Sequence, residues 1–321
     1  MKLPNSRWVL LTLIAFFFTW NAGCSSRAPE KNQENQQSVS LDVETIEEVT
    51  GMTGTESNGE YKLVVPQNDL NVTVDGFKII PPMGMGSWLA FSPTQDGAKL
   101  MGDVLVKENE IAAIQQVLLD YELNVTALHN HFVREQPSVM YMHIGGSGSE
   151  KELASGAKEI FERIAEMREG NPADSEADTV QNSLDTQQIA DILGHEGSMS
   201  RGVYKVTIGR PDVTLMHQDN PVSTFMGFNT WASWQGTPEK AAVAGDFVML
   251  EDEVEPVINT LASNGIEVVA LHNHMIHFTF YGTQKFPVRM KIMRQIFILC
   301  FDISTFKDFS RFRQPRRPGW Y

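Results

Sequence analysis

Two His-x-His pairs in identical sequence surroundings are the strongest candidates for a functional site in this chain. The sequence Ala-Leu-His-Asn-His occurs at residues 127–131 and again at residues 270–274. Side chains two residues apart in an extended strand lie on the same face, so each pair presents two imidazoles to one side. Imidazole nitrogens are common ligands of transition metals. Each pair therefore predicts a candidate metal site.

A neighbouring strand is predicted to bring a third imidazole to the first pair. If the chain turns tightly around Gln136, His143 in the next predicted strand lies directly opposite His129, with Cβ atoms ~4.5–5.5 Å apart. Three imidazoles with a carboxylate or a water form a familiar environment for a transition metal. We therefore predict a divalent metal (zinc, manganese, iron or copper) bound by His129, His131 and His143, with Glu135 as a further ligand or as a general base.

The second pair makes a weaker metal site. His272 and His274 are retained, but nothing at the corresponding positions replaces Glu135 or His143. In both halves the alternative interpretation is that the histidines are hydrogen-bonded core or interface residues, repeated only because the halves share an ancestor. If the protein is an enzyme, a metal-activated water is the expected nucleophile, which indicates a hydrolase or a lyase.

Other polar and aromatic residues give weaker indications. Asp103 and Asp246 each follow a glycine in equivalent strands, where they either orient a histidine or end a strand ladder. Trp88 and Trp231 either line a pocket or pack in the core. Thioether ligands for copper are the remaining option, although methionine usually fills core space; the candidates are Met83, Met85, Met101, Met140 and Met142.

The histidine pairs belong to a longer duplication with a constant offset of 143 residues over almost a hundred positions. Trp88 corresponds to Trp231, and Gly102-Asp103 corresponds to Gly245-Asp246. An unchanged offset through both strand-like and helix-like stretches indicates a duplicated domain without net insertions. We expect repeat domains at residues 41–168 and 184–277, with the second one incomplete, joined by a polar linker at 169–183.

Each repeat is expected to mix short strands and helices. A helix begins after Asp42 or Asp185 as N-cap and ends at Gly51 or Gly194. Strand-like pieces follow, then a helix with apolar residues at helical spacing, then the histidine strand. In the first repeat a further strand and a long helix, residues 151–168, complete the unit. The fold class predicted is α+β, a tandem duplicated domain with mainly antiparallel sheets and a truncated second repeat.

The N-terminus resembles an export signal. Residues 1–23 combine an early positive charge with an apolar run, 8–20, that is too short to span a bilayer, which needs ~20 residues. Small residues precede Cys24, as in bacterial lipoprotein signals, which predicts cleavage before Cys24 and a lipid on its sulfur. Ordinary cleavage or an uncleaved anchor are the alternatives. Residues 24–40 read as a disordered tether, and the expected location is the extracytoplasmic side of the bacterial cell envelope, at an outer membrane if one is present.

The C-terminal segment 278–321 differs from the rest of the chain. It holds nine Lys or Arg against two Asp or Glu, whereas the whole chain has a formal net charge of −14. The 143-residue offset also ends there, at Phe278. We interpret this atypical basic tail as a product of a frameshift, which would leave the second repeat without its closing strand and helix. A genuine basic extension contacting anionic lipid, or an unrelated replacement, would also explain it.

The composition of the folded part restricts which partners it can bind and whether disulfide bonds can stabilise it. Its acidic balance argues against nucleic acid, because binding to nucleic acid depends on Lys and Arg that neutralise phosphates. The chain has two cysteines, Cys24 and Cys300. Disulfides therefore cannot hold the repeats together, and their stability must come from the core.

Several motifs in order resemble the LppY/LpqO family of bacterial lipoproteins. They are Gly-Glu-Tyr-Lys at 59–62, Met-Gly-Asp at 101–103, Thr-Ala-Leu-His-Asn-His at 126–131, Pro-Ser-Val-Met-Tyr-Met-His at 137–143 and Leu-Asp-Thr at 184–186. The resemblance implies an exported two-repeat protein and supplies no catalytic residues. The sequence thus predicts a membrane-tethered protein that binds a divalent metal. The alternative is a metal-free ligand-binding or envelope-structural lipoprotein, whose small-molecule or envelope partner would occupy the groove between the repeats.

Overall fold

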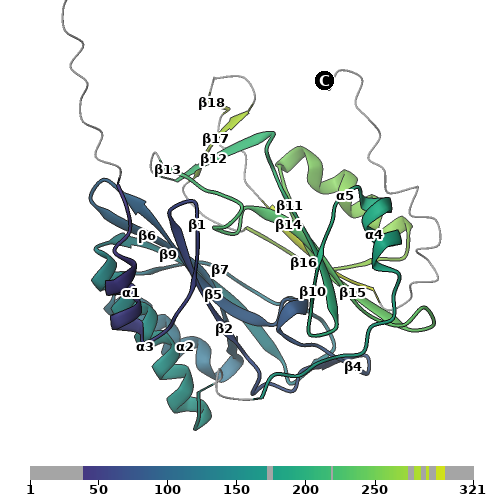
Figure 1. Cartoon of the computed structure of the whole chain (residues 1–321), viewed down its shortest axis with the longest axis horizontal. Helices are drawn as coiled ribbons and strands as arrows, with labels where there is room; N and C mark the ends of the chain where they lie inside the picture. The colour runs from purple at the N-terminus through teal and green to yellow at the C-terminus, as the bar shows by residue number, and fades with distance from the viewer. Residues whose placement is uncertain are drawn as a thin grey trace, which may run out of the picture. The chain divides into compact units, whose positions relative to one another are not determined.

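The computed structural model of the chain (Figure 1) describes residues 39–171, 176–216 and 221–273, together with the backbone of residues 217, 220, 278–282, 287–288 and 294–300. Cys24, His274, His277 and the final segment 301–321 lie outside the described residues. Among the residues described, no helix is long and apolar enough to cross a membrane.

Two six-stranded antiparallel sheets form the framework, and they have the same strand order. The first is β1-β2-β5-β6-β9-β7 and the second is β10-β11-β14-β15-β19-β16, which confirms the tandem α+β fold. The strands of the first sheet are β1 (Thr55–Ser57), β2 (Glu60–Pro66), β5 (Gly86–Thr94), β6 (Gly97–Lys107), β7 (Asn124–His129) and β9 (Val139–Gly148). Those of the second are β10 (Ser198–Ser200), β11 (Val203–Gly209), β14 (Asn229–Gly236), β15 (Ala241–Met249), β16 (Glu267–Asn273) and β19 (Arg294–Cys300).

The helices begin and end at residues that satisfy free backbone groups. Asp42 accepts the amide of Thr45 at the start of α1, and Gly51 ends it with φ 68°, a left-handed conformation that glycine adopts without strain. Asp185 and Gly194 do the same for α4. The helices are α1 (Val43–Thr50), α2 (Ile111–Asp120), α3 (Glu150–Arg168), α4 (Thr186–Leu193) and α5 (Glu251–Ser263), with short 3₁₀ turns η1 (Pro81–Met83) and η2 (Glu108–Glu110).

Each sheet has one face covered by its own helices and one face turned toward the other repeat. Successive residues of β6 point alternately to these two faces. Leu100 and Val104 pack with α1 and α3 in one core cluster, whereas Leu105 packs in a cluster that also contains Val203 and Ala244 of the second repeat. Because the side-chain period of a strand is two, Asp103 shares the face of Leu105 and lies on the side of the second repeat.

The repeated Gly-Asp dipeptide has a packing reason. A Cβ placed on Gly102 would lie 2.6 Å from the Trp88 carbonyl oxygen, and one on Gly245 would lie 2.8 Å from the Trp231 carbonyl oxygen. Only glycine permits this close approach of neighbouring strands. Asp103 follows in the middle of β6, which continues to Lys107, so the interpretation that this residue ends a strand ladder is wrong.

Two smaller sheets accompany the main ones, and the second of them contains the start of the basic tail. One has the order β4-β3-β8, from β3 (Thr73–Val74), β4 (Phe77–Lys78) and β8 (Glu135–Gln136). The other has the order β13-β12-β17-β18, from β12 (Val213–His217), β13 (Asn220–Pro221), β17 (Phe278–Gly282) and β18 (Pro287–Val288). Since β8 pairs with β3 and β17 with β12, the repeat pattern continues into the tail.

The second sheet is not left without its closing strand, contrary to the expectation from the sequence. Residues 294–300 form β19, which lies between β15 and β16 as β9 lies between β6 and β7. Phe297 pairs with Asp246 and Ala270, in the register where His143 pairs with Asp103 and Ala127. The strand was missed because it falls outside the 143-residue offset. A counterpart of α3 is not among the described residues.

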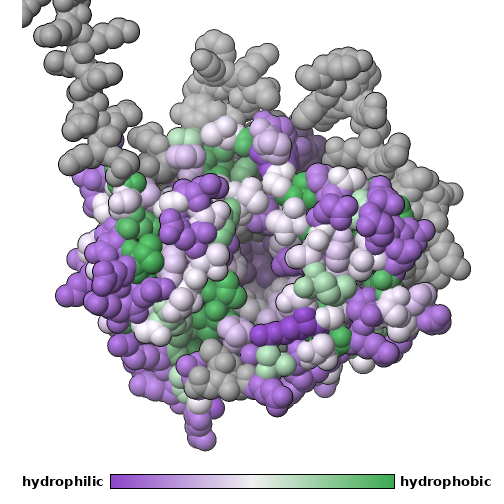
Figure 2. Space-filling view, in the orientation of Figure 1, coloured by the Kyte–Doolittle hydropathy of each residue, from purple (hydrophilic) through white to green (hydrophobic). Residues whose placement is uncertain are grey.

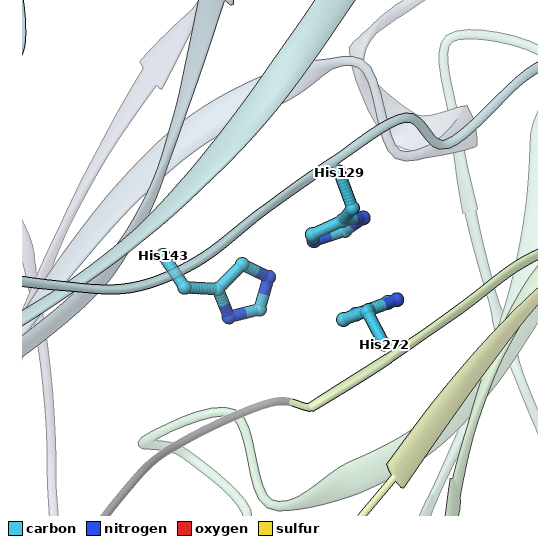
Figure 3. Close-up of side chains that lie close together, drawn as sticks. All are labelled: His129, His143 and His272. Atoms are coloured by element: carbon cyan, nitrogen blue, oxygen red, sulfur yellow. The ribbon is translucent and has the colours of Figure 1, made fainter.

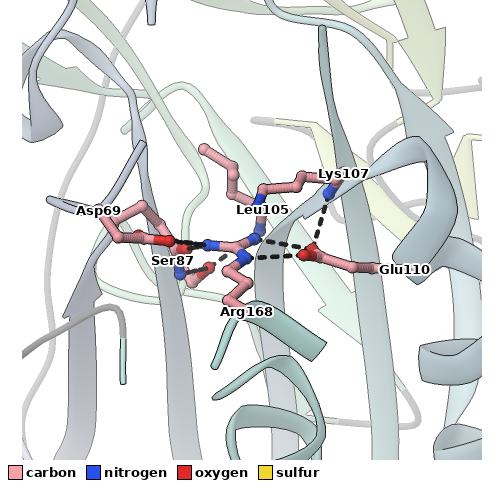
Figure 4. Close-up of polar contacts among 7 residues, drawn as sticks. Asp69, Ser87, Leu105, Lys107, Glu110 and Arg168 are labelled. Atoms are coloured by element: carbon pink, nitrogen blue, oxygen red, sulfur yellow. Dashed lines mark hydrogen bonds and ion pairs between the residues drawn. The ribbon is translucent and has the colours of Figure 1, made fainter. Parts of the chain in front are cut away.

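A buried arginine ties the end of α3 to η2 and to the loop that follows β2 (Figure 4). Arg168 donates two hydrogen bonds of 2.7 Å to Glu110 and lies 3.1 Å from Asp69. In the second repeat Arg210 makes the equivalent contacts, 2.8 Å to Glu253 and 2.8 Å to Asp212. Arg210 lies in a loop of the second repeat, directly after β11. The second repeat therefore neutralises Glu253 and Asp212 without a residue from a closing helix.

The expected linker is partly anchored to the second repeat. The amide of Val180 donates to the carbonyl of Arg201, and the side-chain amide of Asn182 donates to the carbonyl of Trp234. Residues 172–175 lie outside the described residues. The described end of the linker is thus part of the fold of the second repeat.

Candidate metal centre

The histidines of the first repeat stand on neighbouring strands, in a register that differs from the predicted one. Tyr141 lies opposite His129, and His143 lies opposite Ala127, after an irregularity between Val125 and Ala127. The tight hairpin is absent because β8 leaves the main sheet to pair with β3. His143 is therefore diagonal to His129 across the ladder, and their ring centroids are still 4.8 Å apart.

The third member of the cluster comes from the second repeat. His272 of β16 stacks on His129 with ring centroids 3.4 Å apart and planes 11° from parallel. A ligand nitrogen from each of His129, His143 and His272 lies within 4.8 Å of those of the other two (Figure 3). These imidazoles are 9% or less exposed. Equivalent histidines of the two repeats thus meet each other, together with His143.

His131 lies beside this cluster rather than within it. Its ring stacks on Tyr141 with centroids 3.3 Å apart, and its centroid is 5.1 Å from that of His129. Asp103 connects the two groups, since its Oδ2 is 3.8 Å from Nε2 of His131 and 3.7 Å from Nε2 of His143. Donor atoms ~2.0–2.2 Å from a tetrahedral ion are ~3.3–3.6 Å apart, so this spacing is close to that of two ligands of one cation.

Hydrogen bonds made by the Nδ1 nitrogens fix the orientation of two imidazoles. Nδ1 of His129 lies 3.1 Å from the carbonyl oxygen of Asn130, and Nδ1 of His131 lies 3.2 Å from that of Gly84. A carbonyl can only accept, so each Nδ1 carries the proton and each Nε2 carries a lone pair. Nε2 of His129 is buried and has no hydrogen-bond partner among the described residues. This tautomer and this second contact are typical of metal-ligating histidines.

Burial shifts the protonation of the cluster toward neutral imidazoles. It lowers the pKa of His129 to about 4 and holds the pKa of His131 well below its usual range. The same burial raises the pKa of Asp103 to about 8 and, with repulsion from Asp103, raises the pKa of Asp246 well above its usual range. Neutral imidazole is the form that binds a metal, and a cation would favour the ionised aspartates.

Glu135, which was predicted as a ligand or general base, lies outside the imidazole cluster. It lies in β8 of the small sheet, and its carboxylate accepts hydrogen bonds from the backbone amides of Glu135 itself and Val139. The cluster of three ligand nitrogens does not include it. Asp103 is instead the carboxylate next to the imidazoles. The other predicted ligand of the second pair, His274, lies outside the described residues.

The five methionines do not form one thioether site. They are distributed over three hydrophobic clusters: Met83 and Met85 in one, Met101 in a second, and Met142 with the adjoining Met140 in a third. Their positions agree with the ordinary role of methionine as core filler.

A cleft of about 960 Å³ adjoins the cluster and is lined by both repeats. His131, His143 and Asp103 line it from the first repeat, and Asp246 lines it from the second. Trp88 and Trp231 also line it, which agrees with the pocket interpretation. Lys62 and Lys205 join this lining and were not identified from the sequence, although their shared offset of 143 residues was a signal that could have found them.

Comparison with known proteins identifies a family without an assigned activity. Residues 44–163 and 187–279, one stretch in each repeat and together more than half of the chain, match the family described as Domain of Unknown Function (DUF1259). No curated protein and no solved structure matches the chain.

Proposed function

The chain belongs to the DUF1259 family, a two-repeat family of uncharacterised function, and on that premise we propose that it binds a divalent transition metal between its repeats. The proposed ligands are His129 and His143 of the first repeat and His272 of the second. One observation carries the proposal: ligand nitrogens from three separate strands lie within 4.8 Å of one another in a buried place. Buried polar groups normally have partners, and a metal would supply one for Nε2 of His129.

The donor set limits which metal would bind. Three imidazoles with a nearby carboxylate suit zinc, manganese, iron or copper, and they do not suit calcium or magnesium, which prefer oxygen ligands. Asp103 is the candidate fourth ligand or the carboxylate that orients His131 and His143. If the centre is catalytic, a bound metal supplies an activated water for hydrolysis or elimination, and Asp103, which lines the cleft, replaces Glu135 as the candidate base.

Metal analysis of the full-length chain, purified in detergent, tests the proposal. We expect about one transition metal ion per chain, and its loss in His129→Ala and in His272→Ala. His195→Ala is the matched control, because His195 is exposed and outside the cluster. Glu135→Gln should keep the metal, since the Glu135 carboxylate is engaged by backbone amides.

Two results would overturn the metal proposal. One is a folded wild type that contains no metal and takes up none of zinc, copper, manganese and iron. The other is full metal content in both cluster variants. The first result would favour the alternative function, a metal-free ligand-binding or envelope-structural protein that uses the cleft. Circular dichroism and thermal unfolding of every variant separate loss of the ligand from loss of the fold.

We also propose the cellular setting on the sequence alone. The ordered motifs that resemble the LppY/LpqO type, and the small residues before Cys24, support a lipoprotein anchored on the extracytoplasmic side of a bacterial envelope, with the membrane as its first partner. Mass spectrometry of the N-terminal peptide should find a diacylglyceryl group on Cys24. Cys24→Ser should release the protein from the membrane or leave its signal peptide uncleaved. An unmodified Cys24 in the mature protein would reject the anchor.

A further inference from the structure

The cleft between the repeats is lined by matched residues, which come in pairs at the 143-residue offset. The pairs are Lys62 with Lys205, Trp88 with Trp231 and Asp103 with Asp246. In Figure 2 the surface is hollowed between the two repeats. The aspartates are buried, whereas the lysines are partly exposed. A ligand in this cleft would therefore meet the same kinds of side chain from both repeats.

Aromatic rings hold both ammonium groups. Nζ of Lys62 lies 4.5 Å from the ring centroid of Trp88 and 4.7 Å from that of Phe225. Nζ of Lys205 lies 3.8 Å from the ring centroid of Trp231. The electron-rich faces of the rings attract the cations, yet they cannot accept the hydrogen bonds that an ammonium group donates as strongly as an anion does. The rings thus position the lysines and leave their donors available.

No described carboxylate lies within ion-pair distance of either lysine. Glu60 attracts Lys62 and Asp246 attracts Lys205 from longer range, and the two lysines repel each other. Arg201 adds a third cation to the lining of the cleft. Desolvated cations without a paired anion are unfavourable. The two lysines and the exposed Arg201 share the cleft lining with Asp103 and Asp246, in a chain of net charge −14.

We propose that Lys62 and Lys205 together bind the anionic group of a small ligand, a carboxylate or a sulfate- or phosphate-type oxyanion, in the cleft between the repeats. Two ammonium groups, one from each repeat, supply charge-assisted hydrogen bonds to one anionic group. His131, His143 and Asp103 line the same cleft, so a ligand anchored at the lysines also adjoins the imidazole cluster. The anion site does not require the metal.

Titration calorimetry of the full-length chain in detergent tests this site, with sulfate and acetate as separate probes of oxyanion and carboxylate chemistry. Each titration is done on chelator-treated protein and on zinc-loaded protein. Binding of at least one probe to both forms is expected. Lys62→Gln and Lys205→Gln should each weaken it by about tenfold, and the double variant should abolish it. Because Trp88 and Trp231 contact the lysines, the tryptophan emission should change along the same titration.

Lys240→Gln is the matched control, because Lys240 is exposed, lies 4.8 Å from the Phe77 ring centroid and is not part of the cleft lining. It should bind as the wild type does. Lys62→Arg/Lys205→Arg keeps both charges and should retain binding, which covers the case in which the neutral double variant fails to fold.

The outcomes separate the anion site from the metal site. Binding that is lost in the lysine variants supports the anion site, whether or not a metal is found. Binding that needs zinc and survives in the Lys62→Gln/Lys205→Gln protein would show that the anion is a metal ligand, and would overturn the lysine site. Absence of binding of both probes to both forms would also overturn it, while leaving the metal analysis unaffected.

Discussion

Replacing Arg168 with alanine is expected to lower the free energy of unfolding by about 3–5 kcal/mol, the usual cost of removing one partner of a buried ion pair. The Arg168 side chain is 2% exposed and that of Glu110 is 1% exposed, so solvent screening hardly reduces this figure. The substitution leaves the Glu110 carboxylate buried without its two 2.7 Å hydrogen bonds and removes the contact with Asp69.

The second repeat contains the control for this substitution. Arg210 makes the equivalent contacts, but it is 17% exposed, and its partners Asp212 and Glu253 are 22% and 32% exposed. Water can solvate these carboxylates once the arginine is gone, so we expect Arg210→Ala to cost about 1–2 kcal/mol. Arg163→Ala removes only exposed pairs within α3 and should cost less than about 1 kcal/mol.

Urea unfolding followed by circular dichroism measures the three variants. The single variant Glu110→Gln and the double variant Arg168→Ala/Glu110→Gln complete a mutant cycle with Arg168→Ala. The double variant should cost clearly less than the sum of the two single changes, because neither member of the Arg168–Glu110 pair is then left as an unpaired buried charge. Equal costs for Arg168→Ala and Arg210→Ala, or a cost below about 1 kcal/mol for Arg168→Ala, would refute the argument that burial makes this pair important.

Three other results are expected. Removing the metal with a chelator should lower the unfolding temperature of the wild type, because a metal present at 100 times its dissociation constant stabilises the folded state by about 2.7 kcal/mol. The His272→Ala variant, which should hold no metal, should show no such drop, and an equal drop in both proteins would contradict the prediction. Burial lowers the pKa of Lys62 and Lys205 to about 8, and an anion binds the protonated form. Sulfate affinity should therefore be constant below pH 8 and fall above it, because the lysines lose their protons and because Asp103 of the same cleft, whose pKa burial raises to about 8, becomes negatively charged. Calorimetry across this range checks the prediction, and an affinity that stays constant to about pH 10, as for unperturbed lysines, would contradict it. A chain that ends at residue 293 lacks β19, which is the described strand that joins β16 to the second sheet. This shortened chain should bind no metal and should be poorly soluble on expression. A shortened chain that keeps its metal would contradict this placement of β19.

The local elements could be predicted because their causes are local. Asp42 and Gly51 mark the ends of α1 by capping and by a left-handed conformation, and both act within one helical turn. The duplication was readable because an offset of 143 residues needs no knowledge of the fold. The position of β19 was not readable, since strand pairing depends on backbone hydrogen bonds that almost any residue can make.

The features of the candidate metal centre also separate into those with local causes and those that depend on tertiary contacts. The 143-residue offset shows that histidines and aspartates recur on equivalent strands, and strand periodicity predicted that His143 lies near His129, although in another register. Which imidazole joins these two depends on contacts between distant segments. The connection between β7 and β9 runs through β8, which carries Glu135 into another sheet and leaves Tyr141 rather than His143 opposite His129. Contact between the repeats brought His272 onto His129. Periodicity reports which face of a strand a residue occupies, whereas the contact between β7 and β16 depends on how the two sheets pack against each other.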